Sequence, residues 1–105
     1  MRTMISAPKT ARRGEVIEIK TMIAHAMETG YRRDSSGRPV PRNIVNRFVC
    51  TYDGEEVFSA ELFPAVAANP LIAFTTVAVQ TGRLTFAWTD DSGNTETASV
   101  EITVT

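Results

Sequence analysis

Two side chains that can bind a soft metal lie two positions apart in the sequence. His25 offers an imidazole and Met27 a thioether, and both ligand types suit copper. Met4 and Met22 lie elsewhere in the sequence, and two ligands from one short segment rarely complete a metal site. We therefore expect this segment to serve loop packing or contact with a partner, with no resident metal and no cofactor. A copper-carrying domain is the alternative hypothesis.

The sequence holds one cysteine, Cys50, and one histidine, His25. A cysteine acts as a nucleophile only when its pKa is lowered, and Arg47 and Thr51 fall on the opposite face of an alternating strand. We expect a buried structural thiol, with a disulfide to another chain as the alternative. One histidine also leaves little material for acid-base or metal catalysis, so we predict that the protein is not an enzyme.

Positive charge gathers in a long segment without regular alternation, from Ala24 to Arg42. The segment is suited to phosphate, sulfur oxyanions or an acidic chain. Its only aromatic residue is Tyr31, which disfavours nucleic acid because stacking on single strands uses several aromatic rings. A solvated loop without a ligand is the alternative. The arginines concerned are Arg32, Arg33, Arg38 and Arg42.

Charge is divided unevenly along the 105 residues. Residues 1–50 carry ten Lys/Arg against four Asp/Glu, a net charge of +6, and residues 51–105 carry one against eight, a net charge of −7. This division suits either an interaction face or neighbouring strands of opposite charge. The sequence has neither the apolar run of a spanning helix nor that of a signal peptide. We expect one domain over residues 1–105 that binds neither nucleic acid nor membranes.

Alternating apolar and polar residues predict short β-strands along the whole chain, separated by turn residues. The predicted strands are Met4–Ser6, Val16–Ile23, Asn43–Tyr52, Glu55–Phe63, Leu71–Val79, Leu84–Thr89 and Ala98–Val104. This pattern is typical of an all-β, seven-stranded, immunoglobulin-like β-sandwich, and a closed barrel is the alternative. Asp53-Gly54 predicts a tight hairpin, because a type I′ turn needs positive φ at both central residues. Two inward rows are expected, Ile17, Ile19, Thr21 and Ile23 in one strand and Leu84, Phe86 and Trp88 in another.

The connection from Ala24 to Arg42 is longer than ordinary loops, and long loops on rigid sandwiches usually carry function. In an immunoglobulin-like order it leaves the same end as Pro64–Pro70 and Asp90–Asn94. Asp90–Asn94 predicts a tight turn rather than a calcium loop, because the distant bidentate glutamate is missing. We therefore expect this end to be the functional one.

Five stretches of the sequence occur in the order and at the spacing of one known family. They are Gly14–Lys20, His25–Gly30, Pro41–Val45, Ala68–Pro70 and Trp88–Asp91. Together they resemble SoxZ from about Ala7 to the C-terminus, although Ala26 stands where that family commonly has proline. The resemblance implies an immunoglobulin-like sandwich in a tight heterodimer with SoxY, whose C-terminal cysteine carries sulfur intermediates during thiosulfate oxidation.

The resemblance also implies a non-catalytic subunit in the periplasm, exported together with the partner that bears the signal. The carrier thiol is then the partner's, and Cys50 is not a sulfur-binding residue. We hypothesise that five loop residues contact the SoxY-like carrier or, transiently, other Sox enzymes: His25, Met27, Glu28, Arg42 and Asn43. Strand surfaces must add to such a contact, because standard interfaces bury about 1,600 Å². The alternatives are a stand-alone interaction domain and a homodimer of the isolated chain through an exposed sheet edge.

Overall fold

An all-β structure follows from the alternation in the sequence. The structure, a computed structural model, describes residues 2–105. In chain order its strands are β1 (Thr3–Ser6), β2 (Thr10–Ala11), β3 (Val16–Ile23), β4 (Val45–Tyr52), β5 (Glu55–Glu61), β6 (Leu71–Val77), β7 (Gly82–Asp90) and β8 (Thr95–Val104). The predicted number of seven strands was wrong by one. The additional strand, β2, is only two residues long and therefore too short to show alternation.

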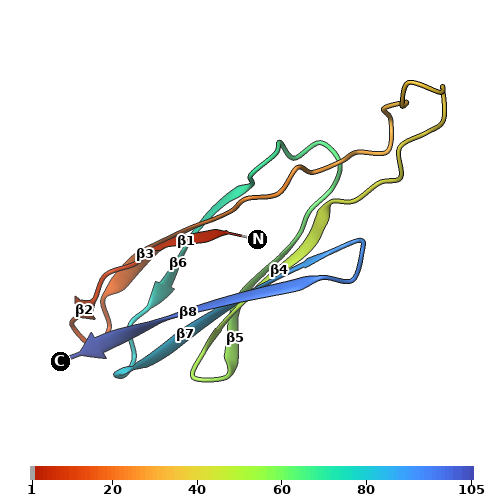
Figure 1. Ribbon diagram of the computed structural model, residues 1–105. Coiled ribbons are helices and arrows are strands. Elements are labelled where there is room, and N and C mark those ends of the chain that lie inside the picture. Colours follow the sequence, from red (N-terminus) through yellow and green to blue (C-terminus); the bar gives the residue numbers. More distant parts are fainter. Residues whose placement is uncertain (1) are drawn as a thin grey trace.

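Two separate sheets form a sandwich-like arrangement (Figure 1). The smaller sheet has the strand order β1-β3-β6, and the larger has the order β2-β8-β7-β4-β5. Neighbouring strands are antiparallel except for β2, which runs parallel to the end of β8. Each sheet keeps its own edge strands, so the structure is a sandwich rather than the closed barrel held as the alternative. Among residues 2–105 no helix is long and apolar enough to cross a membrane.

The core lies between the sheets and is made of the predicted inward rows. Alternate residues of β3 from Ile17 to Ile23 are at most 2% exposed, and Leu84, Phe86 and Trp88 of β7 are fully buried. At the margin, Phe58 of β5 stacks on Phe74 of β6 with ring centroids 4.4 Å apart. Burial of these large apolar side chains supplies the main driving force for folding.

In β4 the inward face is the one that carries Cys50. Phe48, Cys50 and Tyr52 point into the core. Val45 is also fully buried, although alternation places it on the opposite face. The pairing of β4 with β7 shifts register between Val45 and Arg47, and such an extra residue turns the side chains before it to the other face.

The predicted hairpin between β4 and β5 is confirmed. Asp53 and Gly54 have φ values of 49° and 85°, as a turn of this kind requires. At the same end of the molecule, the hydroxyl of Tyr52 donates to the carbonyl of Gln80 and accepts from the backbone N–H groups of Gln80 and Val79. This side chain therefore ties β4 to the connection between β6 and β7.

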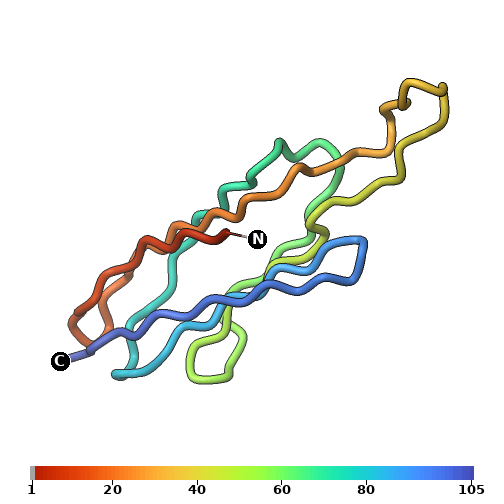
Figure 2. Tube along the Cα trace, in the orientation of Figure 1, coloured from red at the N-terminus to blue at the C-terminus, as the bar shows by residue number. Residues whose placement is uncertain are grey.

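The connection from Ala24 to Arg42 leaves the sandwich as a long projection, drawn in orange and gold (Figure 2). The molecule measures 59 × 19 × 19 Å along its principal axes, with a Cα radius of gyration of 16.2 Å. A compact domain of this length would have a radius of gyration of about 13 Å. The difference shows that the projection stands away from the core instead of folding onto it.

Candidate functional site

The projection is an arm of two antiparallel segments, residues 28–43. At its base, Glu28 and Asn43 exchange two backbone hydrogen bonds of 3.0 and 2.8 Å. Further out, the N–H of Val40 donates to the carbonyl of Arg32 at 2.9 Å, and an isolated bridge pairs Arg33 with Pro39. The arm is therefore a hairpin held by a few backbone hydrogen bonds.

A turn at residues 34–37 closes the tip of the arm. The carboxylate of Asp34 accepts hydrogen bonds from the backbone N–H groups of Ser36 and Arg38 at 2.9 and 3.0 Å. Gly37 adopts a φ of 79°, which glycine reaches without steric cost. Asp34 thus works inside the turn, while Tyr31, 83% exposed, and the arginines nearby face solvent.

Asp91 anchors the outgoing segment of the arm to the sandwich. Its carboxylate accepts hydrogen bonds from Nε and Nη2 of Arg42 at 2.8 and 3.0 Å, from Nδ2 of Asn46 at 2.9 Å and from the backbone N–H of Ile44 at 3.1 Å. The hydrogen bonds from Arg42, then those from Asn46 and Ile44, lower the pKa of Asp91 to about 2. A bidentate pair of this kind fixes orientation as well as position.

His25 anchors the incoming segment of the arm through Asp90, the residue before Asp91. Its Nε2 lies 3.2 Å from a carboxylate oxygen of Asp90, and both side chains are less than a tenth exposed. Its Nδ1 accepts the N–H of Met27 at 2.9 Å, so this geometry assigns the proton to Nε2. The other oxygen of Asp90 accepts the N–H groups of Ser92 and Asn94. Both oxygens of the buried Asp90 carboxylate thus have hydrogen-bond partners, and the contact between His25 and Asp90 holds the arm to the sandwich.

Met27 is 4% exposed, with a φ of 53°, and its Sδ lies 3.3 Å from the N–H of Val45. Its thioether and both ring nitrogens of His25 already have partners within the chain. A copper ion could bind them only by breaking these bonds. Within residues 2–105 no group of three or more His, Cys, Asp or Glu side chains is placed to hold a metal.

The three connections predicted to share one end do meet there. His25 and Asn69 are joined by two hydrogen bonds of 3.0 and 2.8 Å, which link the base of the arm to the segment between β5 and β6. His25 and Arg42 link it to the turn between β7 and β8 through Asp90 and Asp91. The arm is therefore built on the end where these three connections meet, and the function predicted for that end stays a prediction.

The five predicted contact residues all lie at the base of the arm. His25 and Met27 point inward, whereas Glu28 and Asn43 are half-buried and Arg42 is exposed. Glu28 also holds Arg32 through Oε1, with Nη2 at 2.6 Å. Asp90, Asp91 and Asn69 lie in connections and in stretches that carry the resemblance, but nothing in their local sequence shows that their side chains also hold a distant segment.

Cys50 is fully buried in β4, as predicted from the sequence. Burial raises the pKa of its thiol to about 11, because the charged thiolate loses its hydration in the core. A thiol of this kind is unreactive at neutral pH.

Comparison with protein families agrees with the resemblance seen in the sequence. Residues 4–101 match the family described as sulphur oxidation protein SoxZ. The chain belongs to the SoxZ family. This match connects it to the Sox sulfur-oxidation system. No curated protein sequence matches this SoxZ-family chain significantly.

Solved structures with the same fold include proteins of two kinds. A superoxide reductase (neelaredoxin) variant from Ignicoccus hospitalis matches with a TM-score of 0.76 and 15% identity, over 98% of this chain and 79% of that chain. A putative superoxide reductase from Thermotoga maritima matches with a TM-score of 0.75 and 16% identity, over 98% of this chain and 85% of that chain. The sulfur carrier protein SoxY from Chlorobium limicola f thiosulfatophilum matches with a TM-score of 0.68 and 16% identity, over 98% of this chain and 78% of that chain. At these identities the likeness shows a shared fold.

Proposed function

We propose that this chain is the non-catalytic subunit of a SoxYZ-type heterodimer, in which it supports the cysteine-bearing arm of a SoxY-like sulfur carrier. The observation that carries the proposal is the family match, which spans residues 4–101 of 105. The reactive thiol belongs to the partner in this scheme. The buried Cys50, whose pKa is raised to about 11, supports that division of roles.

The strand order supports an immunoglobulin-like type within the sandwich class. In the constant-type immunoglobulin order the first, second, fourth and fifth strands form one layer and the third, sixth and seventh form the other. This chain follows that order except for its fourth main strand, β5, which pairs with β4 in the second layer. Here β1, β3 and β6 form the first layer, and β4, β7 and β8 lie in the second. A rigid frame of this type suits a subunit that lends surface to a partner rather than reactivity.

The arm is the part of this subunit that we propose as the docking element for visiting Sox enzymes. Arg33 and Arg38 lie exposed beside the tip, and neither forms an ion pair in the part of the chain that the structure describes. Exposed guanidinium groups without a carboxylate partner favour an acidic protein surface or a sulfur oxyanion. Of the five predicted contact residues, Glu28, Arg42 and Asn43 can then touch a visitor directly, while His25 and Met27 hold the arm in place.

A periplasmic location belongs to the same proposal. Its support is family membership alone, through a SoxY-like partner that bears the export signal for both subunits. Detection of the two subunits together in a periplasmic fraction, before and after removal of the partner's signal, checks it.

The test combines co-purification with sulfur turnover. We expect this chain to co-purify with the SoxY-like carrier of the same organism and to be required for thiosulfate-dependent turnover by the remaining Sox proteins. Turnover of a sulfur compound by the isolated chain, or full activity of the carrier without it, contradicts the proposal.

A charge reversal tests the arm. We expect the double variant Arg33→Glu/Arg38→Glu to keep the carrier bound but to lower turnover about tenfold, because docking loses its cationic contacts. The matched control, Arg12→Glu/Arg13→Glu, changes the net charge by the same amount in an exposed turn outside the arm. The backbone N–H of Arg13 in this turn donates a hydrogen bond to the carbonyl of Thr105. Equal turnover in both variants refutes the docking role.

A further inference from the structure

One sheet edge combines length with a lack of charge. The edge strand β6 has the sequence Leu-Ile-Ala-Phe-Thr-Thr-Val, without a charged residue. On the other edges, β5 carries three glutamates, the uncovered part of β8 carries Glu96 and Glu101, and β1 and β2 have only four and two residues. Charge and short length are the usual protections of free edges against pairing with another chain. The β6 edge has neither.

The hydrogen-bond pattern shows which backbone groups this edge presents. The N–H of Ile23 donates to the carbonyl of Pro70, and the N–H of Ala78 donates to the carbonyl of Glu15. These two pairs are therefore hydrogen-bonded pairs that continue the β3–β6 ladder at its ends. Bonded and non-bonded pairs alternate in an antiparallel ladder. The residues of β6 whose N–H and C=O groups therefore point away from β3, toward the free edge, are Leu71, Ala73, Thr75 and Val77.

The outer face of the same sheet is apolar at both ends. Register places Met4, Met22 and Leu71 in one row across the three strands, with Met4 62% and Leu71 64% exposed. A second row pairs Val16 with Val77. The charged side chains between these rows, Glu18 and Lys20, neutralise each other across 3.4 Å.

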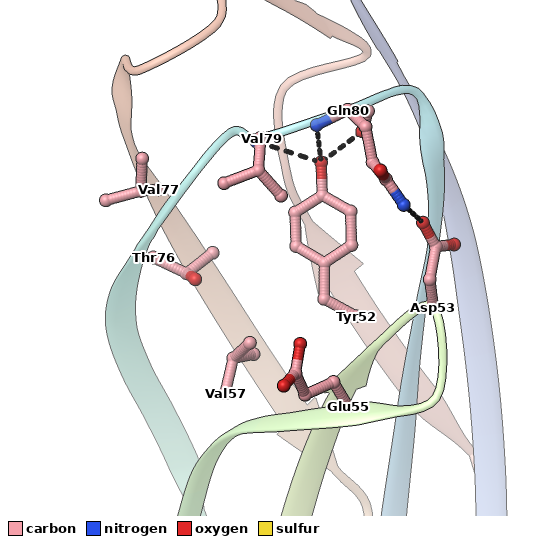
Figure 3. Close-up of a pocket in the computed structure, with 8 residues that line it drawn as sticks. All are labelled: Tyr52, Asp53, Glu55, Val57, Thr76, Val77, Val79 and Gln80. Carbon is pink, nitrogen blue, oxygen red and sulfur yellow. Dashed lines mark hydrogen bonds between the residues drawn. The ribbon is translucent and has the colours of Figure 1, made fainter.

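A groove of about 500 Å³ lies beside β6 toward β5, and both valines and polar side chains, among them Asp53 and Glu55, line it (Figure 3). Figure 3 shows Val57 of β5 on one side and Thr76 and Val79 on the other. Val57, Val77 and Val79 are 36 to 53% exposed. The face, the edge and the groove therefore form one continuous surface around β6, which we call the β6 surface.

The outer face of the larger sheet has a different character. It presents small polar side chains, such as Thr97 and Ser99 of β8, and the ion pair of Arg83 with Glu101 at 3.1 Å. Such a face is well solvated. Permanent interfaces are more apolar than the rest of a protein surface, so the β6 surface fits a permanent partner better.

The size of the β6 surface sets what it can bind. Three strands of up to eight residues give a face of only about 26 by 14 Å, at roughly 3.3 Å per residue and 4.8 Å between strands. A standard interface buries about 800 Å² on each partner, so the face alone is too small. A stable partner must also cover the edge and the groove, and an added strand from that partner does so.

We propose that the β6 surface is the seat of the SoxY-like carrier, which adds a strand to the free edge of β6. This inference rests on the proposed function, because that function supplies a permanent partner. The solved SoxY chain shares the fold over 98% of this chain, so a carrier of that type is itself built of strands, one of which can pair with a free edge. Backbone hydrogen bonds then give affinity, and the exposed valines and leucine give specificity.

Amide hydrogen exchange of this chain, free and in complex with the carrier, reads the edge directly. We expect the amides of Leu71, Ala73, Thr75 and Val77 to exchange rapidly in the free chain and to be slowed at least about tenfold in the complex. The amides of Ile72, Phe74 and Thr76, already bonded to β3, are slow in both. Unchanged exchange of the first set in a formed complex overturns the proposal.

Substitutions test the same surface by affinity. We expect Leu71→Glu/Val77→Glu to weaken carrier binding about a hundredfold, because two charges enter an apolar contact. Thr75→Pro removes one edge N–H group without removing a bond to β3, and we expect at least about tenfold weaker binding. The control Thr97→Glu/Ser99→Glu adds the same charges to the larger sheet. Circular dichroism verifies that each variant is folded.

The outcomes separate this inference from the proposed function. If the unsubstituted chain does not bind the carrier, both fail. If it binds and the β6 variants bind as tightly, only the inference is overturned. If the β6 variants lose self-association of this chain but keep the carrier, the occupant is a second copy, and the assignment to the carrier is wrong.

Discussion

At the scale of single residues, two adjacent aspartates have distinct tasks at the base of the arm. Asp90 is buried and holds His25 and the turn that follows it, whereas Asp91 holds the segment from Arg42 to Asn46. Asp90 is the last residue of β7 and Asp91 the first of the turn that follows, and from there their carboxylates reach the two segments of the arm. The two anchors together fix the direction in which the arm leaves the sandwich.

The low pKa of Asp91 makes its contribution to stability depend on pH. The folded value of about 2 lies below the value of an unfolded aspartate, about 3.9, so the stabilisation is complete above pH 4 and is lost as the pH falls toward 2. We expect Asp91→Asn to lower the free energy of unfolding at pH 7 by about 1 kcal/mol, a value reduced by solvent screening. Chemical unfolding of both proteins between pH 2 and pH 7 checks this, and parallel curves contradict it.

The raised pKa of Cys50 predicts an inert thiol. With a pKa of about 11, roughly one thiol in a thousand is ionised at pH 8. We expect a thiol-reactive chromophore to label the native protein only at the rate of unfolding and to label the denatured protein within seconds. We also expect Cys50→Ala to leave sulfur turnover by the complex unchanged. Rapid labelling of the native chain contradicts the assignment of this residue to the core.

At the scale of elements, the strands could be predicted from the sequence and the arm could not. Alternation identified the inward rows of β3 and β7 because side chains in a strand repeat every two residues. The arm lacks this signal, since Glu28 and Asn43 pair across fourteen intervening residues through backbone groups alone. The inward position of Met27 depends on a positive φ, which no pattern of residue types indicates.

Among the candidate site residues, position along the chain was predictable and role was not. The sequence placed His25 and Arg42 at the loop-bearing end, and the structure confirms that the three connections meet there. It could not show that Asp90 and Asp91 are the partners of these side chains. Contacts between residues more than forty positions apart depend on the packing of the sheets, which local patterns do not contain.

Gly30 tests how closely the two segments of the arm must approach. Its φ is 87°, and a Cβ atom added there would lie 3.0 Å from the Cβ of Arg42. Gly37 has a similar φ of 79° and open space around it. We expect both Gly→Ala variants to lose about 1 kcal/mol of stability through backbone strain. Only Gly30→Ala should also shift the NMR signals of Arg42 and Asp91, and equal spectra of the two variants at these positions contradict the close approach.

At the scale of the whole molecule, the arm dominates the shape. We expect small-angle X-ray scattering to give a maximum dimension close to the 59 Å of the longest axis, and a radius of gyration near 16 Å. An arm that folds back onto the sandwich would give a radius of about 13 Å instead. The variant Asp91→Ala, which removes the anchor of Arg42, should broaden the distribution of distances without changing the content of β-structure.

The length of the arm makes it a lever. About seven residues separate its base from its tip, a reach of roughly 20 Å, so a rotation of about 10° at the base moves the tip by roughly 3.5 Å. That displacement exceeds the length of a hydrogen bond. Angular error at the pivot is thus magnified at the point where a visitor would be met. Short polar contacts gather around Asp90 and Asp91 at the base of the arm. Stiffness at this pivot limits the movement of the tip more than stiffness further along the arm does.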